Sequence, residues 1–129
     1  MIFRPRILSD AFSKNMTAVS NFKHSIIPKR YTADNVGISP PFNIYGVPSN
    51  TRAMHILVND LDAPGGSYYH LNAKFPVTKS IKEGQFKNYI PPNPPKGDKA
   101  HKYVFTITAL NERGDDIGKA TIVGYYGRE

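Results

Sequence analysis

The sequence contains no cysteine and no tryptophan among its 129 residues. Without cysteine, the chain can form no disulfide bond, no thiolate metal site and no cysteine nucleophile. The same absence removes an indicator of compartment, because such a chain folds equally well in reducing and oxidising surroundings. The large apolar side chains of a core must therefore include the eight tyrosines and seven phenylalanines.

Long apolar runs are also missing, since none approaches the roughly 18 residues that a membrane-spanning helix needs. Met1–Asp10 contains arginines but no continuous apolar stretch, so no signal peptide is predicted and the expected location is the cytoplasm. No helix-turn-helix, zinc-finger or aromatic–basic RNA pattern is present, and we expect no specific nucleic-acid partner. The formal net charge of +7 instead favours phosphate or anionic lipid surfaces.

The composition that remains predicts one mainly β domain over residues 1–129. Eleven prolines and ten glycines are typical of frequent turns between short elements and disfavour a helical bundle. Residues 53–59 are apolar at nearly every position, as in a central strand. Residues 101–110 and 117–126 are rich in β-branched and aromatic residues. Residues 13–24 lack a clear period, so they are interpreted as a loop, an insertion or one short helix.

A further strand is predicted over residues 67–75, where side chains alternate between two faces. One face carries Tyr69, Leu71, Ala73 and Phe75. The other carries Tyr68, His70, Asn72 and Lys74, and by this pattern alone it faces solvent.

Two short motifs lie at predicted strand ends. Asp60-Leu61-Asp62-Ala63-Pro64 follows one strand, and Pro94-Pro95-Lys96-Gly97 precedes the strand that begins at His101. His101 and Tyr103 are two residues apart and therefore point to the same face. Asp60 shares the parity of the apolar positions before it. We therefore expect these side chains at the point where a buried face opens into a polar cavity.

The chemistry of these residues suits an anion. Asp60 beside a histidine raises the imidazole pKa above its reference of about 6.5. The prolines lack amide donors, and the amides that follow them are expected to be free for a bound anion. Two imidazolium groups, a tyrosine hydroxyl and free amides are suitable donors to phosphate or carboxylate. Alternatively, Asp60 makes an Asx turn and His101 lies in water at a strand end.

Taken in order, these motifs resemble the two signatures of the phosphatidylethanolamine-binding protein family, and His70 occupies the place of a pocket histidine between them. Residues 8–12, 38–48 and 118–126 also fit, and the similarity is greatest to the short bacterial-type members. The resemblance implies antiparallel sheets packed face to face, few and short helices, and no C-terminal helix. It implies ligand contacts at Asp60, His70, Pro94, Pro95, His101 and Tyr103, and turn roles at Asp62, Ala63, Pro64 and Gly97.

Several residues depart from the family pattern. Leu61 replaces a proline, Asn93 replaces a glycine, and Lys102 replaces an arginine and so lacks the bidentate fork. The section from 70 to 94 is shorter than usual. Two interpretations stay open: a more open pocket or a degenerate remnant.

The resemblance implies a non-enzymatic protein that binds a phosphorylated small molecule or a phospholipid headgroup such as phosphoethanolamine, without a cofactor. Regulation or inhibition of a kinase or protease is a further expectation. The alternative is a hydrolase in which Asp60 orients a general-base histidine toward a phosphorylated or ester substrate, although no nucleophile motif is present. No metal site is expected, because the histidine spacing matches no helix-borne motif. His24 and His55 are assigned to packing or solvent.

Overall fold

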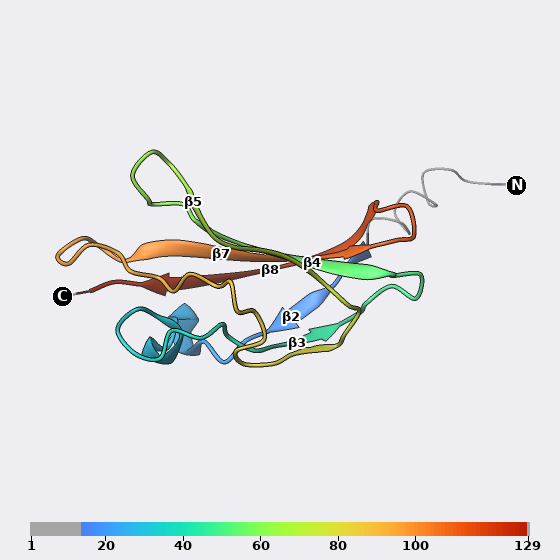
Figure 1. Ribbon diagram of the computed structural model, residues 1–129, viewed down its shortest axis with the longest axis horizontal. Helices are drawn as coiled ribbons and strands as arrows, with labels where there is room; N and C mark the ends of the chain where they lie inside the picture. The colour runs from blue at the N-terminus through green and yellow to red at the C-terminus, as the bar shows by residue number, and fades with distance from the viewer. Residues whose placement is uncertain (1–13, 129) are drawn as a thin grey trace, which may run out of the picture.

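The computed structural model describes residues 14–128, which form two β-sheets packed face to face (Figure 1). The larger sheet has the order β1 (Lys14–Asn15), β8 (Asp116–Tyr126), β7 (His101–Leu110), β4 (Ala53–Asp60) and β5 (Tyr68–Phe75). The smaller sheet has the order β2 (Thr17–Val19), β3 (Phe42–Tyr45) and β6 (Ser80–Ile81). Neighbouring strands are antiparallel except for the parallel pair β1–β8. The mainly β prediction is confirmed.

Helical structure within residues 14–128 consists of two three-residue 3-10 helices, η1 (Lys23–Ser25) and η2 (Lys29–Tyr31). No helix in this part of the chain is long and apolar enough to cross a membrane. The few, short helices expected from the sequence are thus confirmed.

The core lies between the two sheets. In β4 every second side chain is buried, as the period of a strand requires. Phe42 from β3 and Phe105 from β7 meet there, with ring centroids 5.5 Å apart. Each such aromatic contributes about 1.5–3 kcal/mol when removed from water. β4 and β7 are long, neighbouring strands at the centre of the larger sheet. Their packing against the core therefore fixes the positions of the residues at the strand ends.

The interpretation of segment 13–24 as a loop, an insertion or one short helix is wrong at residues 14–15 and 17–19, which form β1 and β2. Residues 20–22 form no helix or strand, and the short helix η1 begins at Lys23. β1 pairs with Gly118 and Lys119, and β2 pairs with Asn43–Tyr45. Local periodicity misses these strands because they are two and three residues long and their partners are remote in sequence. Ser13 and residues 8–12, which resemble the family pattern, lie outside the described residues.

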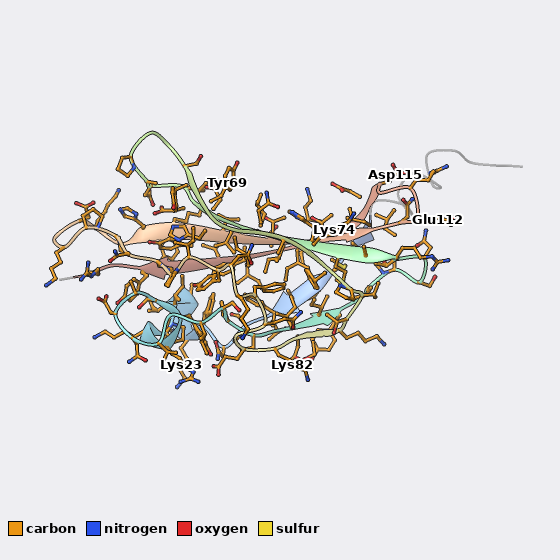
Figure 2. All side chains as sticks on the ribbon, in the orientation of Figure 1. Lys23, Tyr69, Lys74, Lys82, Glu112 and Asp115 are labelled. Carbon is orange, nitrogen blue, oxygen red and sulfur yellow. The ribbon has the colours of Figure 1, made fainter. Side chains whose placement is uncertain are left out.

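A β-bulge at His70 changes the predicted faces of β5. Val58 pairs with Leu71 and Asn59 pairs with Tyr69, so His70 is an extra residue in the ladder. His70 is 6% exposed and neighbouring Leu71 is 3% exposed. Tyr69 is 54% exposed, on the opposite side of the strand (Figure 2). The alternating pattern alone, which places His70 on a solvated face, is therefore misleading here, because a bulge reverses the alternation. The family resemblance instead indicated a pocket position for His70.

Three segments meet at one end of the larger sheet: the β4–β5 loop, the loop before β7 and the C-terminal end of β8 (Figure 1). They carry both sequence motifs. The antiparallel pairing of β4 with β7 opposes Asp60 to Tyr103, which brings motifs about forty positions apart into contact.

Candidate functional site

A pocket of about 320 Å³ lies at this end of the sheet. This volume is in the lower part of the range of about 300–1,000 Å³ that is typical of small-molecule sites. Five of the six predicted contact residues line it: Asp60, His70, Pro94, Pro95 and His101. The other lining residues are Ala63, Pro64, Tyr68, Ile90, Pro91 and Asn93.

The centre of the pocket is a buried pair of Asp60 and His101. Asp60 Oδ2 accepts a hydrogen bond from His101 Nδ1 at 2.8 Å, and each side chain is only 6% exposed. The last inward position of β4 supplies Asp60, and the first inward position of β7 supplies His101. The expected convergence of these two residues is present. The alternative that His101 lies in water is wrong.

The environment of His101 favours its protonated form. Burial by itself would lower the pKa of the imidazole, but the hydrogen bond and the charge of Asp60 outweigh it, and Asp98 and Asp62 add to their effect. The pKa of His101 is therefore raised above its usual value. Nε2 lies 3.4 Å from Asp98 Oδ2, so both ring nitrogens face carboxylates.

His70 differs from His101 in both partner and charge. Its Nδ1 donates to the carbonyl oxygen of Ile90 at 2.6 Å, while the Ile90 amide donates to the carbonyl of His70 at 2.8 Å. Burial lowers the pKa of His70, against smaller opposing effects of the Ile90 carbonyl and Asp60. The ring is therefore neutral at pH 7, with Nε2 as an acceptor. The expectation of two imidazolium groups is wrong, because burial without an adjacent carboxylate favours the neutral ring.

Tyr103 lies beneath the pocket. It is 0% exposed, and its ring packs edge-on against His70 with centroids 5.4 Å apart. Within residues 14–128 its hydroxyl has no hydrogen-bond partner. Burial raises the pKa of this hydroxyl, so it remains protonated. Tyr103 supports the His70 ring and does not line the pocket wall.

The turn residues of the first motif hold the β4–β5 loop. Asp60 Oδ1 accepts from the Asp62 amide at 2.9 Å, which is the Asx turn considered from the sequence. Asp62 Oδ2 accepts from the amide of Lys102 at 2.7 Å. Asp60 therefore serves the turn with one oxygen and the pocket histidine with the other. The Asx-turn interpretation of Asp60 is confirmed, and the same side chain also lines the pocket.

The amides after the double proline are engaged by the protein. The Gly97 amide donates to the carbonyl of Arg128 at 3.1 Å, and the Asp98 amide donates to that of Pro95 at 3.4 Å. Gly97 has a φ of +87°, a conformation that favours glycine. The expectation that these amides are free for an anion is wrong at Gly97 and Asp98, because the loop satisfies its own donors.

Two polar residues at this site escaped the sequence prediction. Asp98 contacts His101, and Arg128 Nη1 donates to Asn93 Oδ1 at 3.0 Å and reaches the Pro94 carbonyl at 3.5 Å. The bond from Arg128 gives a structural role to Asn93, the residue that replaces a glycine. A charged residue three positions before a motif histidine was a usable signal for Asp98. Arg128 gave none, since its partners are 34 and 35 positions away.

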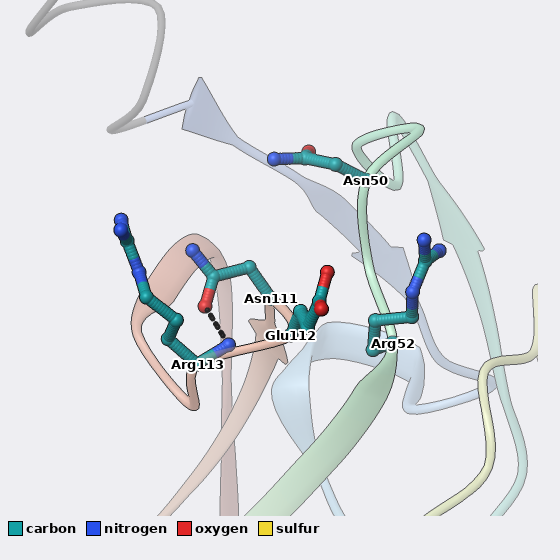
Figure 3. A pocket seen from close by; sticks show the side chains of 5 residues that line it. All are labelled: Asn50, Arg52, Asn111, Glu112 and Arg113. Atoms are coloured by element: carbon teal, nitrogen blue, oxygen red, sulfur yellow. Dashed lines mark hydrogen bonds between the residues drawn. The ribbon is translucent and has the colours of Figure 1, made fainter.

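A second hollow lies at the opposite end of the sheet and has a different character (Figure 3). Its lining residues are Asn50, Arg52, Asn111, Glu112 and Arg113. Asn111 Oδ1 accepts from the amides of Arg113 and Asp115 at 3.0 and 2.9 Å. These contacts hold the β7–β8 turn and account for the arrangement without a ligand.

The other two histidines lie away from the pocket. His55 Nε2 is 2.6 Å from Asn72 Oδ1, and both belong to the outer side of the larger sheet. His24 is exposed, with a φ of +53°. Their assignment to packing or solvent agrees with these positions. Within residues 14–128 no group of three or more histidine or acidic side chains is arranged to hold a metal ion.

Comparison with known proteins gives the family. The phosphatidylethanolamine-binding protein family model matches residues 18–126, so the chain belongs to this family. A UPF0098 protein of Aquifex aeolicus is 33% identical over 140 residues, covering 80% of this chain and 82% of the relative. A UPF0098 protein of Pyrococcus horikoshii is 33% identical over 109 residues, covering 68% of this chain. The chain spans only 55% of the length of that second relative.

Two solved structures share the fold. A phosphatidylethanolamine-binding protein homologue from Chlamydia trachomatis superposes with a TM-score of 0.77 at 27% identity, covering 91% of this chain and all of the other. Escherichia coli YBCL, described as a new member of the mammalian family, also gives a TM-score of 0.77, covering 89% and 99% of the two chains. At 20% identity, the likeness to YBCL concerns the fold alone.

Proposed function

We propose that the pocket binds a phosphorylated small molecule or a phospholipid headgroup of the phosphoethanolamine kind. The observation that carries the proposal is the buried His101, held by Asp60 at 2.8 Å in the wall of a pocket. An imidazolium is a strong hydrogen-bond donor to phosphate oxygen. Pro64, Pro94 and Pro95 give the pocket apolar walls without amide groups that need partners. Family membership supports a ligand-binding protein of this kind.

Hydrolysis has weaker support. The Asp60–His101 pair has the geometry in which a carboxylate orients a histidine. A general base, however, must present its other nitrogen, unprotonated, to a water or hydroxyl. In this pocket Nε2 faces the Asp98 carboxylate, and the raised pKa of His101 favours the form in which that nitrogen carries a proton. Both features oppose a base and favour a donor that binds.

Titration with glycerophosphoethanolamine, monitored by phosphorus NMR, tests the proposal. This phosphodiester keeps one negative charge from about pH 5 to about pH 8, so the pH dependence of binding reports the protein alone. We expect saturable binding that weakens as pH rises through the pKa of His101. His101→Ala should weaken it at least about tenfold.

His55→Ala is the matched control, because it removes a histidine from the outer side of the sheet. Its affinity should equal that of the wild type. A flat titration of the wild-type protein would refute the proposed function, and so would equal affinities for the wild type and His101→Ala.

A further inference from the structure

The donors and acceptors of the pocket are unevenly matched. His101 is the one positively charged side chain among the residues that line it, and no lysine or arginine lines this pocket within the described part of the chain. Asp60 Oδ2 occupies His101 Nδ1, and Asp98 Oδ2 faces Nε2. One imidazolium thus faces two carboxylates, which gives this group a net charge of about −1.

His70 adds another acceptor. Its Nδ1–H donates to Ile90, so the neutral ring has a lone pair on Nε2. None of the hydrogen bonds within residues 14–128 uses that nitrogen. The Gly97 and Asp98 amides already have backbone partners. A ligand that offers only phosphate oxygens would therefore find a single donor, and that donor faces Asp98.

Asp98 is well placed to respond to a ligand. Its side chain is 52% exposed on the loop between Pro95 and His101, whereas His101 is 6% exposed. The 3.4 Å separation is long for a charge-assisted hydrogen bond, so little is lost when the carboxylate moves aside. When the Asp98 carboxylate moves away from His101 Nε2, water can still solvate it, because the side chain is exposed. A ligand phosphate can then take the position beside Nε2.

We propose that Asp98 determines the specificity of this pocket: its carboxylate disfavours simple phosphates and favours a phosphate that carries an amine, whose ammonium group pairs with Asp98. This inference rests on the proposed function and assigns a residue to the choice of ligand. A phosphate alone would add negative charge to a group that already has a net charge of about −1. The ammonium group of an aminoalkyl phosphate offsets part of that negative charge. The shared chemistry is an aminoalkyl phosphate, whether it is a free metabolite or a lipid headgroup.

Calorimetric titration of the wild type and three variants with a matched ligand pair tests this inference. O-phosphoethanolamine and ethyl phosphate differ only in the amine. We expect the wild type to prefer phosphoethanolamine by about tenfold, the scale of one charge-assisted contact. In Asp98→Asn the preference should fall to about twofold or less, mainly because ethyl phosphate binds more tightly. Asp116→Asn removes an exposed carboxylate at the start of β8 and should keep the wild-type ratio.

Asp98→Glu retains the charge and should retain at least half of the preference. If phosphates bind in a His101-dependent way but Asp98→Asn keeps the wild-type ratio, the specificity inference is overturned and the proposed function stands. If neither phosphate binds to the wild type or to Asp98→Asn, the specificity inference fails. The proposed function fails with it when glycerophosphoethanolamine does not bind either.

Glycerophosphoethanolamine separates the two sources of this chemistry. Binding as tight as that of phosphoethanolamine supports a lipid headgroup, because the diester reproduces the headgroup linkage. An amine-dependent preference confined to the monoester supports a soluble metabolite. Both results support the role of Asp98, provided that the preference depends on its carboxylate.

Discussion

His70 and His101 show how two residues of one type acquire opposite charge states about one pocket. Both side chains are almost fully buried, and burial alone disfavours the imidazolium in each. His101 has a carboxylate at 2.8 Å, whereas the nearest partner of His70 is a neutral carbonyl. The difference of partner decides the charge. One ring is therefore a hydrogen-bond donor at both nitrogens, and the other has an acceptor nitrogen.

The two histidines should titrate on opposite sides of the reference pKa of about 6.5. We expect the ring resonances of His101 to give a pKa above this value and those of His70 to give one below it. In Asp60→Asn the pKa of His101 should fall, because its main opposing partner is neutral. Proton NMR of the ring Cε1–H signals measures all three values. Equal pKa values for the two rings would contradict this electrostatic description.

The pair of Asp60 and His101 should also stabilise the fold in a pH-dependent manner. Since the folded pKa of His101 is raised, its contribution is fully present below about pH 6.5 and is lost as pH rises through the folded value. Asp60→Asn should therefore lower the free energy of unfolding by about 3 kcal/mol at pH 6. At pH 9 the loss should be about 1 kcal/mol or less.

Urea unfolding of the variant and the wild type at both pH values measures these losses. His70 acts with the opposite sign below about pH 6.5. Because the charge of Asp60 also raises the pKa of His70, Asp60→Asn lowers that pKa further and adds to the loss at pH 6. Asp116→Asn serves as the control and should be nearly neutral at both values. A loss that grows from pH 6 to pH 9 would be inconsistent with the ion pair.

At the scale of the elements, β8 and the segment after β2 pack closely at one point. A Cβ added to buried Gly124 would lie 2.5 Å from Ile27 Cγ1 and 3.0 Å from the Phe22 ring. Ile27 is 1% exposed, and its amide donates to the carbonyl of Tyr125 at 2.9 Å. The isoleucine therefore has little freedom to move away. A glycine is needed here for close approach.

Gly124→Ala should destabilise the protein by about 1–3 kcal/mol, the usual cost of overpacking a core. The affinity for glycerophosphoethanolamine should stay within about twofold of the wild type at temperatures where the variant is folded. Thr121→Ala, on the exposed side of the same strand, should change stability by about 0.5 kcal/mol or less. Thermal and urea unfolding measure both variants. Unchanged stability of Gly124→Ala would show that Ile27 can move aside.

The strands illustrate what local pattern can and cannot predict at this scale. The boundaries of β7 match the predicted 101–110, because β-branched and aromatic residues fill that stretch. β4 extends one residue beyond the predicted 53–59. The short strands β1, β2 and β6 were missed, since two or three residues carry no periodic signal. Their formation depends on edges supplied by longer strands.

For the whole molecule, the net charge of +7 acts mainly outside the pocket. Lys29, Lys96 and Arg128 line a separate groove, where Asp34 pairs with Arg128 at 3.2 Å. Such charges attract anionic surfaces without a specific fit. Charge-driven binding and pocket binding should therefore be separable.

Binding to phosphatidylglycerol vesicles should fall steeply as salt rises from about 50 mM to about 300 mM, because the screening length shortens through about 10 Å. His101→Ala should leave this binding unchanged, since the pocket takes no part in it. Vesicle sedimentation at each salt concentration gives the comparison. Retention that depends on His101, or that resists salt, would place anionic-lipid binding in the pocket after all.

The sequence by itself determined which residues face the core at the pocket end of β4 and β7. The two-residue period of a strand is a property of the backbone, so Asp60 and His101 could be assigned to a buried face. The family resemblance further predicted that Asp60 and His101 lie close together. The pairing of Asp60 with Tyr103 in the structure brings their strand ends side by side.

Only the tertiary structure decided the orientation of His70, the partners of the Gly97 and Asp98 amides, and the contact of Asp98 with His101. Each depends on how separate segments meet: the β4–β5 register with its bulge, and the seating of the proline loop against Arg128. Register and seating follow from packing across the sheet, which acts between residues far apart in sequence. The local sequence pattern does not predict that packing. The charge of the pocket depends on the packing, because it sets the partners of His70, His101 and Asp98.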